Sequence, residues 1–445
     1  MAETVESTVM EGTLGSQGQG QKSPEKEATS GSGLSASQRK LVVLMTHINI
    51  AMYSTCFWIQ QGALPYLTKK LGVDPVVYGY LQTTFAVVQL CGGPLFGRFG
   101  DLFGTRSALV LAFSAAALSY GLLGMAEGML LLFLSRLPSF LMHSMQGAQM
   151  VVTDISDENS RADALGKLGL SYGIGMIVGP FLGGQVTKYF SEQHSAYLAM
   201  AGSLVSIVLV VLFIPANTKA GKKASESSKD DSGPSSVFDV KAIAKLLTIP
   251  VAAYLLLVRT IVGTPLGIFQ SMFSVIAMDR FNIGPEENGY LMSYIGMSNM
   301  VMMGLGVGIL TKRYNEGLLL KWAIYMFTFG YLLLAGANVT WHIYVTVIPL
   351  TIGGTIMNTV ISSTLTKVVP PDSTGTMLGL SMASNSIIRT MSPTVGGLML
   401  GYAGYPSFGI VGFVVNTLLS VYMLFSQTHA TVVAAVERQN AKKES

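Results

Sequence analysis

Apolar residues in this chain gather into twelve long blocks, and these blocks limit the possible folds more than any other feature. They run near 41–66, 77–97, 107–126, 129–152, 164–187, 196–216, 251–278, 289–310, 318–337, 341–365, 374–400 and 407–427. A helix of about 20 residues crosses the hydrocarbon of a bilayer and satisfies its own backbone hydrogen bonds there. Only 12% of the residues are charged, whereas about 25% are charged in soluble proteins. We therefore predict an all-α polytopic membrane protein with twelve transmembrane helices.

Polar segments divide these helices into two groups of six. The predicted organisation is a disordered cytoplasmic tail at 1–38, a six-helix bundle at 39–216, a cytoplasmic linker at 217–249, a second six-helix bundle at 250–427 and a cytoplasmic tail at 428–445. The first tail is rich in Ser, Gly, Glu and Gln, a composition that cannot bury a core. In the linker, apolar residues between Phe238 and Leu247 stand beside two lysines. This pattern predicts either a short helix on the membrane surface or an early start of the seventh helix.

Basic residues in the loops predict the orientation. The loops on one side hold about 18 Lys and Arg side chains, and those on the other side hold only Lys69, Lys70, Lys188 and Arg280. Cytoplasmic loops carry the excess of basic residues. Both termini are therefore predicted to be cytoplasmic.

The two groups of helices repeat each other in sequence. Gly79-Tyr80-Leu81 recurs as Gly289-Tyr290-Leu291, 210 positions later. A second set, Leu165-Gly166, Pro180 and Gly183-Gly184, recurs 213 positions later as Leu378-Gly379, Pro393 and Gly396-Gly397. The shared order and near-constant offset predict two pseudo-symmetric bundles. Internal repeats of this kind are typical of secondary transporters with a site between the repeats.

A loop motif follows the second helix. The segment "GRFGDLFGTRSAL" places Gly97, Asp101, Gly104 and Arg106 at a predicted tight cytoplasmic turn. It resembles the loop signature G-x-x-x-D-x-x-G-x-R of the major facilitator superfamily, although Leu102 stands where a basic residue usually follows the aspartate. The resemblance implies the fold of that superfamily, with two six-helix bundles, and implies that Asp101 latches onto the positive start of the eleventh helix near 372–375. The alternative is a solvated turn with a weak charge pair.

Glycines and a proline interrupt the fifth helix in a regular pattern. The positions are Gly166, Gly175, Gly179, Pro180, Gly183 and Gly184. Glycines four residues apart share one helix face, where a neighbouring helix can approach closely, and the proline permits a bend. The whole pattern resembles the motif of the antiporters of the superfamily, which implies a helix that rocks against its partner. Ordinary packing by small residues is the alternative. The preceding segment "TDISDENSRADALGKLG" resembles tetracycline-type antiporters and implies a cytoplasmic gate at Asp154 and Arg161.

Charged side chains inside a membrane are costly and usually functional. Arg136, Arg259 and Arg389 fall in predicted helices, whereas every acidic residue falls in a tail, a loop or a helix end. A proton-coupled exporter needs a titratable membrane group, and His143, with His47 nearer the cytoplasmic end, is the candidate. Arg136 and His143 are seven residues apart, which predicts one helix face. The arginines could also be structural, with Arg136 snorkelling toward the interface, and His143 could be a hydrogen-bonded packing residue.

The resemblance also implies which side chains line the pathway. Helices 1, 4, 7 and 10 line the cavity in the superfamily, which favours Gln60, Arg136, His143, Arg259 and Asn358, and Arg389 is added by its charge. Similarity to drug and organic cation transporters implies alternating access with export of lipophilic organic cations in exchange for protons. An organic anion facilitator or symporter suits the arginines better and stays open. A membrane scaffold or sensor that recruits cytosolic partners through the linker also stays open.

Other classes of function find little support. No nucleophile–base set, metal cluster or phosphate loop suggests an enzyme, so neither a cofactor nor a metal is expected. The expected partners are the lipid bilayer, a small organic ion and protons, with no nucleic acid. We expect a monomeric multi-pass protein of the plasma membrane, including its apical surface.

Overall fold

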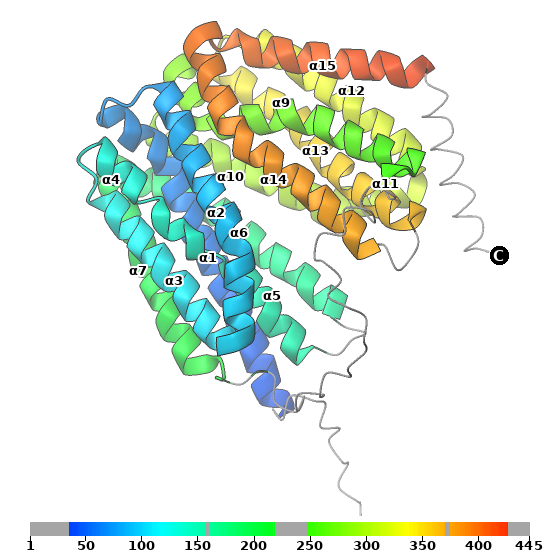
Figure 1. Ribbon diagram of the computed structural model, residues 1–445. Coiled ribbons are helices and arrows are strands. Elements are labelled where there is room, and N and C mark those ends of the chain that lie inside the picture. The colour runs from blue at the N-terminus through cyan, green and yellow to red at the C-terminus, as the bar shows by residue number, and fades with distance from the viewer. Residues whose placement is uncertain (1–34, 157–160, 217, 219–246, 370–373, 426–445) are drawn as a thin grey trace, which may run out of the picture.

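The computed structural model describes residues 35–156, 161–216, 218, 247–369 and 374–425 (Figure 1). Within these residues the chain forms helices and no strand. The first half contains α1 (Ala36–Lys70), α2 (Pro75–Phe103), α3 (Thr105–Gly124), α4 (Met129–Leu134), η1 (Leu137–Leu141), α5 (Ser144–Ile155), α6 (Arg161–Tyr189) and α7 (Glu192–Phe213). The second half contains α9 (Pro250–Phe281), α10 (Pro285–Val301), η2 (Met302–Gly306), α11 (Val307–Arg313), α12 (Glu316–Ala335), α13 (Thr340–Val368), α14 (Thr374–Leu398), η4 (Met399–Ala403) and α15 (Pro406–Phe425).

These segments form two six-rod bundles, one from each half of the chain (Figure 1). Segments α4, η1 and α5 make one interrupted rod, and α10, η2 and α11 make another. By length and composition, nine described segments can cross a membrane, and α2, the α4–α5 rod and α14 complete the twelve. The predicted all-α fold with twelve spans is therefore confirmed. The proposed surface helix from Phe238 to Leu247 lies almost entirely outside the described residues.

The helices begin at signals in the sequence. At the start of α2, the Asp74 carboxylate accepts hydrogen bonds from the backbone N–H groups of Val76 and Val77 at 2.8 and 3.0 Å, and Pro75 occupies the first turn, where a missing N–H costs nothing. The end of α9 is marked by Asn282 in the left-handed region, with φ of 51°. Asparagine tolerates this conformation better than most residues, so the turn into α10 is sharp.

The fourth rod differs from the prediction of one continuous helix over 129–152. It breaks into α4, the 3-10 turn η1 and α5. Pro138 in η1 lacks a backbone N–H and its ring blocks the helical path before it, which accounts for the interruption. Arg136 precedes η1 and His143 precedes α5 with a non-helical ψ of 42°. The prediction that these two residues share one face of a continuous helix is wrong.

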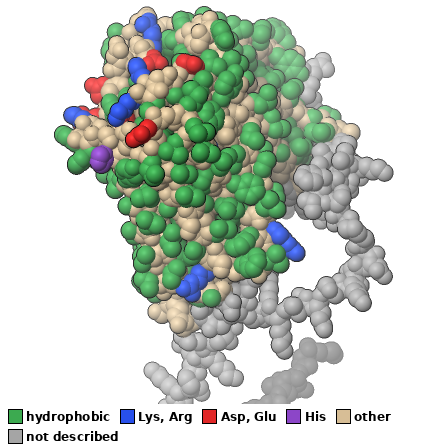
Figure 2. Space-filling model, turned by 60° about the vertical axis from the view of Figure 1, so that its left-hand side comes forward, with side chains coloured by type: hydrophobic (Ala, Val, Ile, Leu, Met, Phe, Trp, Pro, Cys, Tyr) green, Lys and Arg blue, Asp and Glu red, His purple; other side chains and the backbone are tan. Residues whose placement is uncertain are grey.

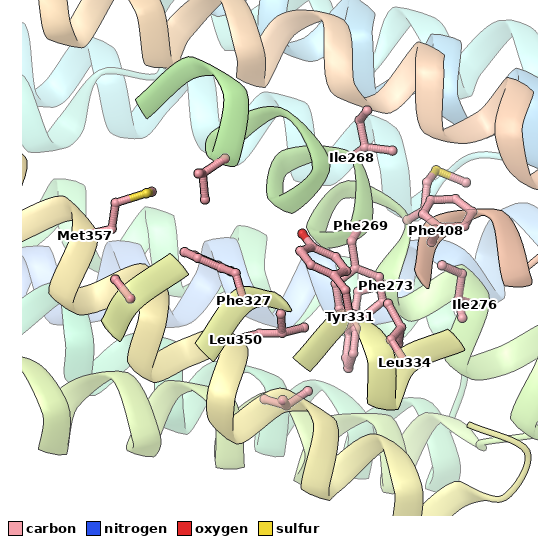
Figure 3. Close-up of a cluster of buried hydrophobic side chains, with 14 of the residues drawn as sticks. Ile268, Phe269, Phe273, Ile276, Phe327, Tyr331, Leu334, Leu350, Met357 and Phe408 are labelled. Carbon is pink, nitrogen blue, oxygen red and sulfur yellow. The ribbon is translucent and has the colours of Figure 1, made fainter. Parts of the chain in front are cut away.

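Hydrophobic side chains cover most of the outer surface. Figure 2 shows a broad apolar face with charged side chains gathered toward its two ends. Inside the second bundle, Phe327 and Tyr331 of α12 pack with Phe269 and Phe273 of α9 and with Leu350 of α13 (Figure 3). Because lipid is as apolar as these side chains, close packing rather than the hydrophobic effect holds the helices together.

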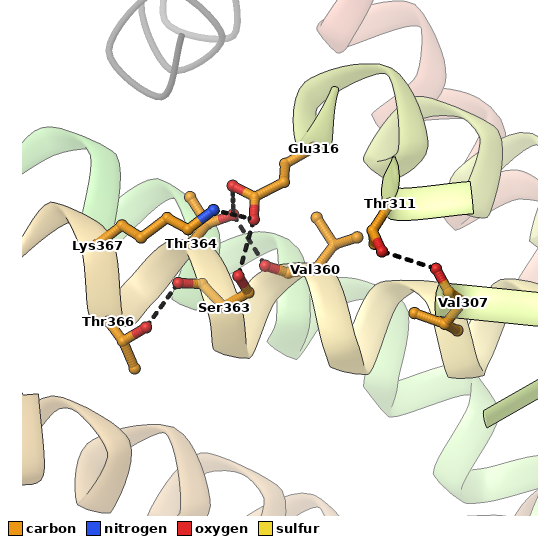
Figure 4. Close-up of polar contacts among 8 residues, drawn as sticks. All are labelled: Val307, Thr311, Glu316, Val360, Ser363, Thr364, Thr366 and Lys367. Carbon is orange, nitrogen blue, oxygen red and sulfur yellow. Dashed lines mark hydrogen bonds and ion pairs between the residues drawn. The ribbon is translucent and has the colours of Figure 1, made fainter. Parts of the chain in front are cut away.

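A polar cluster fastens α12 to the end of α13. The Glu316 carboxylate accepts hydrogen bonds from the hydroxyls of Ser363 and Thr364 at 2.8 and 3.1 Å (Figure 4). It also pairs with the Lys367 ammonium at 2.7 Å. The side chains of Glu316 and Lys367 are only 11% and 25% exposed, so this charge pair is well shielded and joins two rods of the same bundle.

Candidate functional site

The two bundles are held together at one end. The Lys69 ammonium of α1 lies 2.7 Å from the Asp279 carboxylate of α9. Lys188 of α6 pairs with Glu286 at the start of α10. Among the described residues, the hydrogen bonds and ion pairs between the bundles lie toward this end, which the sequence predicts to be extracellular.

Two equivalent glycine crossings bring the bundles into backbone contact. Where α6 crosses α10, a Cβ atom on Gly184 would lie 2.7 Å from the carbonyl oxygen of Pro285. Where α14 crosses α2, a Cβ atom on Gly397 would lie 2.6 Å from the carbonyl oxygen of Pro75. The prolines are 210 positions apart and the glycines 213. The sequence repeat therefore appears in space as a pair of matched contacts between the halves.

The remaining glycines of the α6 motif face a different partner. Gly175, Gly179 and Gly183 lie against α1 of the same bundle, where added Cβ atoms would lie 2.5 to 2.8 Å from atoms of Ser54, Thr55 and Ile59. The predicted close approach on one face is present. Gly166 has no atom within 4 Å of an added Cβ, so the first glycine of the motif has no packing role in this conformation. Pro180 lies inside α6 at its crossing with α10, where its carbonyl oxygen is 2.5 Å from an added Cβ on Gly289.

The loop motif is built around the turn between α2 and α3. Gly104 has φ of +86°, a conformation that favours glycine, and an added Cβ would lie 3.2 Å from the carbonyl oxygen of Ala216. Arg106 donates a 2.6 Å hydrogen bond to the carbonyl oxygen of Val211. Gly97 leaves room for the Gln146 amide, 2.9 Å from an added Cβ. Asp101 is exposed, and the first two residues of the expected latch position at 372–375 lie outside the described residues, so the latch stays a prediction.

One of the two predicted gate residues, Asp154, joins this loop through a threonine. The Asp154 carboxylate accepts a 2.5 Å hydrogen bond from the Thr218 hydroxyl, which also bonds the hydroxyl of Thr105 at 2.8 Å. The Arg161 Nε atom is buried and lacks a hydrogen-bond partner. Asp154 is thus tied to the α2–α3 turn, and the described contacts do not pair it with Arg161.

A polar cluster in the second bundle brings together two of the predicted pathway residues. Arg259 of α9 donates through Nη2 to the amide oxygen of Asn358 at 2.9 Å and through Nε to that of Asn385 at 3.0 Å. Its Nη1 lies 3.4 Å from the Ser362 hydroxyl. Arg259 is 6% exposed, whereas both asparagines are exposed. The three hydrogen-bond acceptors of this buried guanidinium are all neutral. Among the described residues, no carboxylate balances its positive charge.

Arg389 places this cluster opposite the first bundle. It stands one helical turn after Asn385 on α14 and is exposed, so both side chains share a helix face. It lies within electrostatic range of Tyr53 of α1 and Tyr172 of α6. Arg259, Asn358, Asn385 and Arg389 together form what we call the polar wall of the second bundle. Two aromatic residues of the first bundle, Tyr53 and Tyr172, lie within electrostatic range of it.

Arg136 does not snorkel, contrary to expectation. It is 1% exposed, lies near Tyr78 and Tyr120, and its Nε and Nη2 atoms have no hydrogen-bond partner. The break in the fourth rod explains this position, because η1 takes the chain off the helical path and turns the guanidinium into the bundle. Gln60 of α1 is 2% exposed and also has an unpartnered donor, Nε2.

The two candidate histidines have different surroundings. His47 of α1 lies 2.8 Å from the hydroxyl of Ser171 in α6 through its Nδ1 atom. His143 packs against Phe96 with ring centroids 5.4 Å apart, and its buried Nε2 has no hydrogen-bond partner. His143 therefore has one ring nitrogen that makes no hydrogen bond among the described residues.

Several residues of this region escaped the sequence analysis. They are Asn385 and Ser362 beside Arg259, and Asp279 and Glu286 at the closed end. Asn385 lies one turn before Arg389 in the sequence, which was an available signal. In the described parts of the chain, no group of three or more His, Cys, Asp or Glu side chains could hold a metal ion.

Comparison with known proteins places the chain among transporters. The profile of the Major Facilitator Superfamily matches residues 46–393. Human solute carrier family 67 member A1 is 42% identical over 90% of this chain and 96% of its own length. Mouse solute carrier family 22 member 18 is 42% identical over 87% of this chain and 96% of its own length.

The chain also has a more distant relative in sequence and a similar solved structure. The class D tetracycline resistance protein of Salmonella ordonez is 26% identical over 62% of this chain and 68% of its own length. The crystal structure of the nucleoside transporter NupG superposes with a TM-score of 0.68 at 16% identity, covering 88% of this chain and 98% of that structure. At this identity the structural likeness concerns the fold alone.

Proposed function

Because this chain belongs to the major facilitator superfamily, we propose that it is a secondary active transporter that works by alternating access and exchanges a small organic ion for protons. The observation that carries this proposal is the one-ended closure of two pseudo-symmetric bundles, made by the matched crossings at Gly184 and Gly397. Two bundles that meet at one end and face each other across a polar wall are arranged to rock about that wall.

The proposed cycle has two states. In the predicted orientation, the pairs Lys69–Asp279 and Lys188–Glu286 close the extracellular end. The Asp101 loop is proposed to hold the opposite state, in which the cytoplasmic end is closed. Substrate or proton can drive the exchange only by binding the two states with different affinity.

Two substrate classes have support. Export of lipophilic organic cations is favoured by relatives named for tetracycline or multidrug resistance. Organic anions are favoured by the two arginines of the polar wall, Arg259 and Arg389, because positive charges repel cations. Proton coupling is proposed to use His143, whose Nε2 is buried and unpartnered.

Flux into proteoliposomes tests this proposal. Labelled cations and anions are offered with and without an imposed proton gradient to the wild-type protein, to His143→Ala and to the control His194→Ala. His194 is exposed at the start of α7, so its loss should leave flux unchanged. We expect gradient-driven flux in the wild type and the control and its loss in His143→Ala.

Other results would redirect the proposal. Flux that ignores the gradient would indicate a facilitator, and normal coupling in His143→Ala would remove that histidine from the proton path. No flux of either class, from a folded protein, would favour a scaffold or sensor. The plasma membrane and a monomeric state belong to this proposal and are checked by microscopy and by mass in detergent.

A further inference from the structure

Arg259 fixes the orientation of two asparagine side chains on the wall between the bundles. A guanidinium has only hydrogen-bond donors, so the amide atoms that face it must be oxygens. The hydrogen bonds of 2.9 and 3.0 Å from Arg259 to Asn358 and Asn385 are therefore accepted by the single oxygen of each side-chain amide. Each amide NH2 group then points away from Arg259, on a side chain that is exposed.

The exposed wall consequently offers donors and positive charge. Asn358 and Asn385 present NH2 groups, and Arg389 adds a guanidinium one turn beyond Asn385. Every described Asp and Glu lies in a loop or in a terminal turn of a helix. A ligand that meets this wall thus finds hydrogen-bond donors and positive charge, and no carboxylate among the described residues that could hold a cation.

The opposite wall is aromatic. Phe57 of α1 is half-buried and stacks on the buried Tyr53, with 6.5 Å between ring centroids. Tyr53 lies within electrostatic range of Arg389. Phe57 also contacts Trp58 and Phe85, with centroids 5.7 and 6.1 Å apart. Aromatic rings favour flat apolar ligands, and Arg389 lies within electrostatic range of two tyrosines of this bundle, Tyr53 and Tyr172.

We infer that the geometry of Arg259, Asn358, Asn385 and Arg389 forms a binding site for the anionic group of an aromatic organic anion, such as an aryl carboxylate or sulfonate, whose ring lies against the half-buried Phe57. The inference rests on the proposed transport function for the role of this wall as the substrate site. Arg259 acts as a positioning residue, and the two amides and Arg389 contact the anion.

Two probes of equal shape and opposite charge test the inference. Radiolabelled 2-naphthalenesulfonate and (2-naphthyl)trimethylammonium share one ring system and carry permanent charges. Binding is measured on the purified full-length protein in nanodiscs, and flux is measured separately in proteoliposomes. We expect saturable binding of the sulfonate, with weak or no binding of the ammonium probe.

Variants locate the site. Asn385→Asp replaces a donor with a negative acceptor that still pairs with Arg259, and should weaken sulfonate binding at least about tenfold. Arg389→Gln should weaken it similarly without adding a negative charge. The matched control is Asn338→Asp, an exposed position that already bonds Arg280 at 3.2 Å on the predicted outer surface, where binding should not change.

The outcomes separate the two proposals. Sulfonate binding without flux would keep the inference and remove transport. Flux of the ammonium probe without sulfonate binding would overturn the inference and keep transport. Equal loss of binding in Asn338→Asp and Asn385→Asp, or no loss in folded Asn385→Asp and Arg389→Gln, would also overturn it.

Discussion

Arg136 is a charged side chain in a place where charge is expensive. It is buried, and its Nε and Nη2 donors find no acceptor among the described residues. An uncompensated buried charge lowers stability by several kcal/mol, and replacing buried charges by apolar residues of similar volume is often neutral or stabilising. A residue that costs stability and persists inside a membrane bundle is best explained by function.

Substituting Arg136 by Met should therefore separate stability from activity. We expect an unchanged or higher Tm, because a flexible apolar side chain fills the same space without an unsatisfied charge. We expect transport to be lost. Thermal unfolding in detergent and flux in proteoliposomes are the measurements, with Arg98→Met, an exposed site on α2, as the control. A fall in Tm of several degrees would mean that the guanidinium is satisfied and structural.

The sequence predicts single residues of this site better than it predicts their partners. Arg259 and Asn358 were both expected to line the pathway, and they bond each other at 2.9 Å. Asn385 and Ser362 complete the same cluster but were not predicted. Placing an arginine inside a membrane costs free energy, so its presence in an apolar segment identifies it as a candidate from sequence alone. The rotation of α14 that brings Asn385 to Arg259 is instead set by packing against other helices.

At the scale of elements, the number of rods was predicted and their continuity was not. Long apolar blocks set the twelve spans, and bilayer thickness makes this prediction robust. The fourth block contains Pro138, and the break at η1 follows from it. Prolines at positions 65, 94, 180 and 265 lie inside helices that continue. Sequence alone does not tell which proline breaks a membrane helix, because neighbouring helices can satisfy the freed backbone groups.

The paired crossings yield a prediction with a built-in control. Gly184→Ala and Gly397→Ala should each loosen the closed end, because an added methyl meets a backbone carbonyl at 2.7 or 2.6 Å, and overpacking of this kind costs about 1–3 kcal/mol. Gly166→Ala and Gly379→Ala have nothing within 4 Å and should be neutral or slightly stabilising. Labelling of a cysteine that replaces the buried Tyr66, whose hydroxyl donates to the carbonyl oxygen of Ile283 at the closed end at 2.8 Å, measures the opening, with the same replacement in the parent protein and all four variants.

Those four variants also test the motif itself. Faster labelling in Gly184→Ala and Gly397→Ala alone would assign the crossings to the closure of this end. Equal labelling in all four folded variants would mean that the crossings at Gly184 and Gly397 do not govern the opening.

At the scale of the molecule, the structure represents one of the two states that alternating access requires. The ion pairs at the closed end, between α1 and α9 and between α6 and α10, are exposed to different degrees; the Lys69 and Asp279 side chains are 58% and 38% exposed. Exposed pairs of this kind contribute about 0.2–1 kcal/mol each. Contacts this weak are suited to a gate, because binding energy of a few kcal/mol is enough to reverse them.

Removing a charge at the predicted extracellular end and removing one at the predicted cytoplasmic end should therefore shift the ratio of the two states in opposite directions. Lys188→Gln removes the positively charged partner of Glu286, which keeps hydrogen bonds from Gln185 and Tyr290, and should depopulate the conformation described here. Asp101→Asn removes the proposed latch of the other state and should populate this conformation further. An exposed interaction of up to about 1 kcal/mol corresponds to a shift of up to about fivefold in the ratio of states, with little effect on folding.

Energy transfer between dyes measures that ratio. The dyes are placed at Leu102, near the end of α2, and Asn315, before α12, in a protein without Cys56 and Cys91. Closing the cytoplasmic end brings these positions together and raises the transfer efficiency. Asp163→Asn is the matched control, since its side chain is 69% exposed and, among the described residues, it forms an ion pair with Lys167 of the same helix. If Asp101→Asn raises the transfer efficiency, or matches the control, the loop does not hold the cytoplasm-closed state, and closure of that end must depend on other contacts.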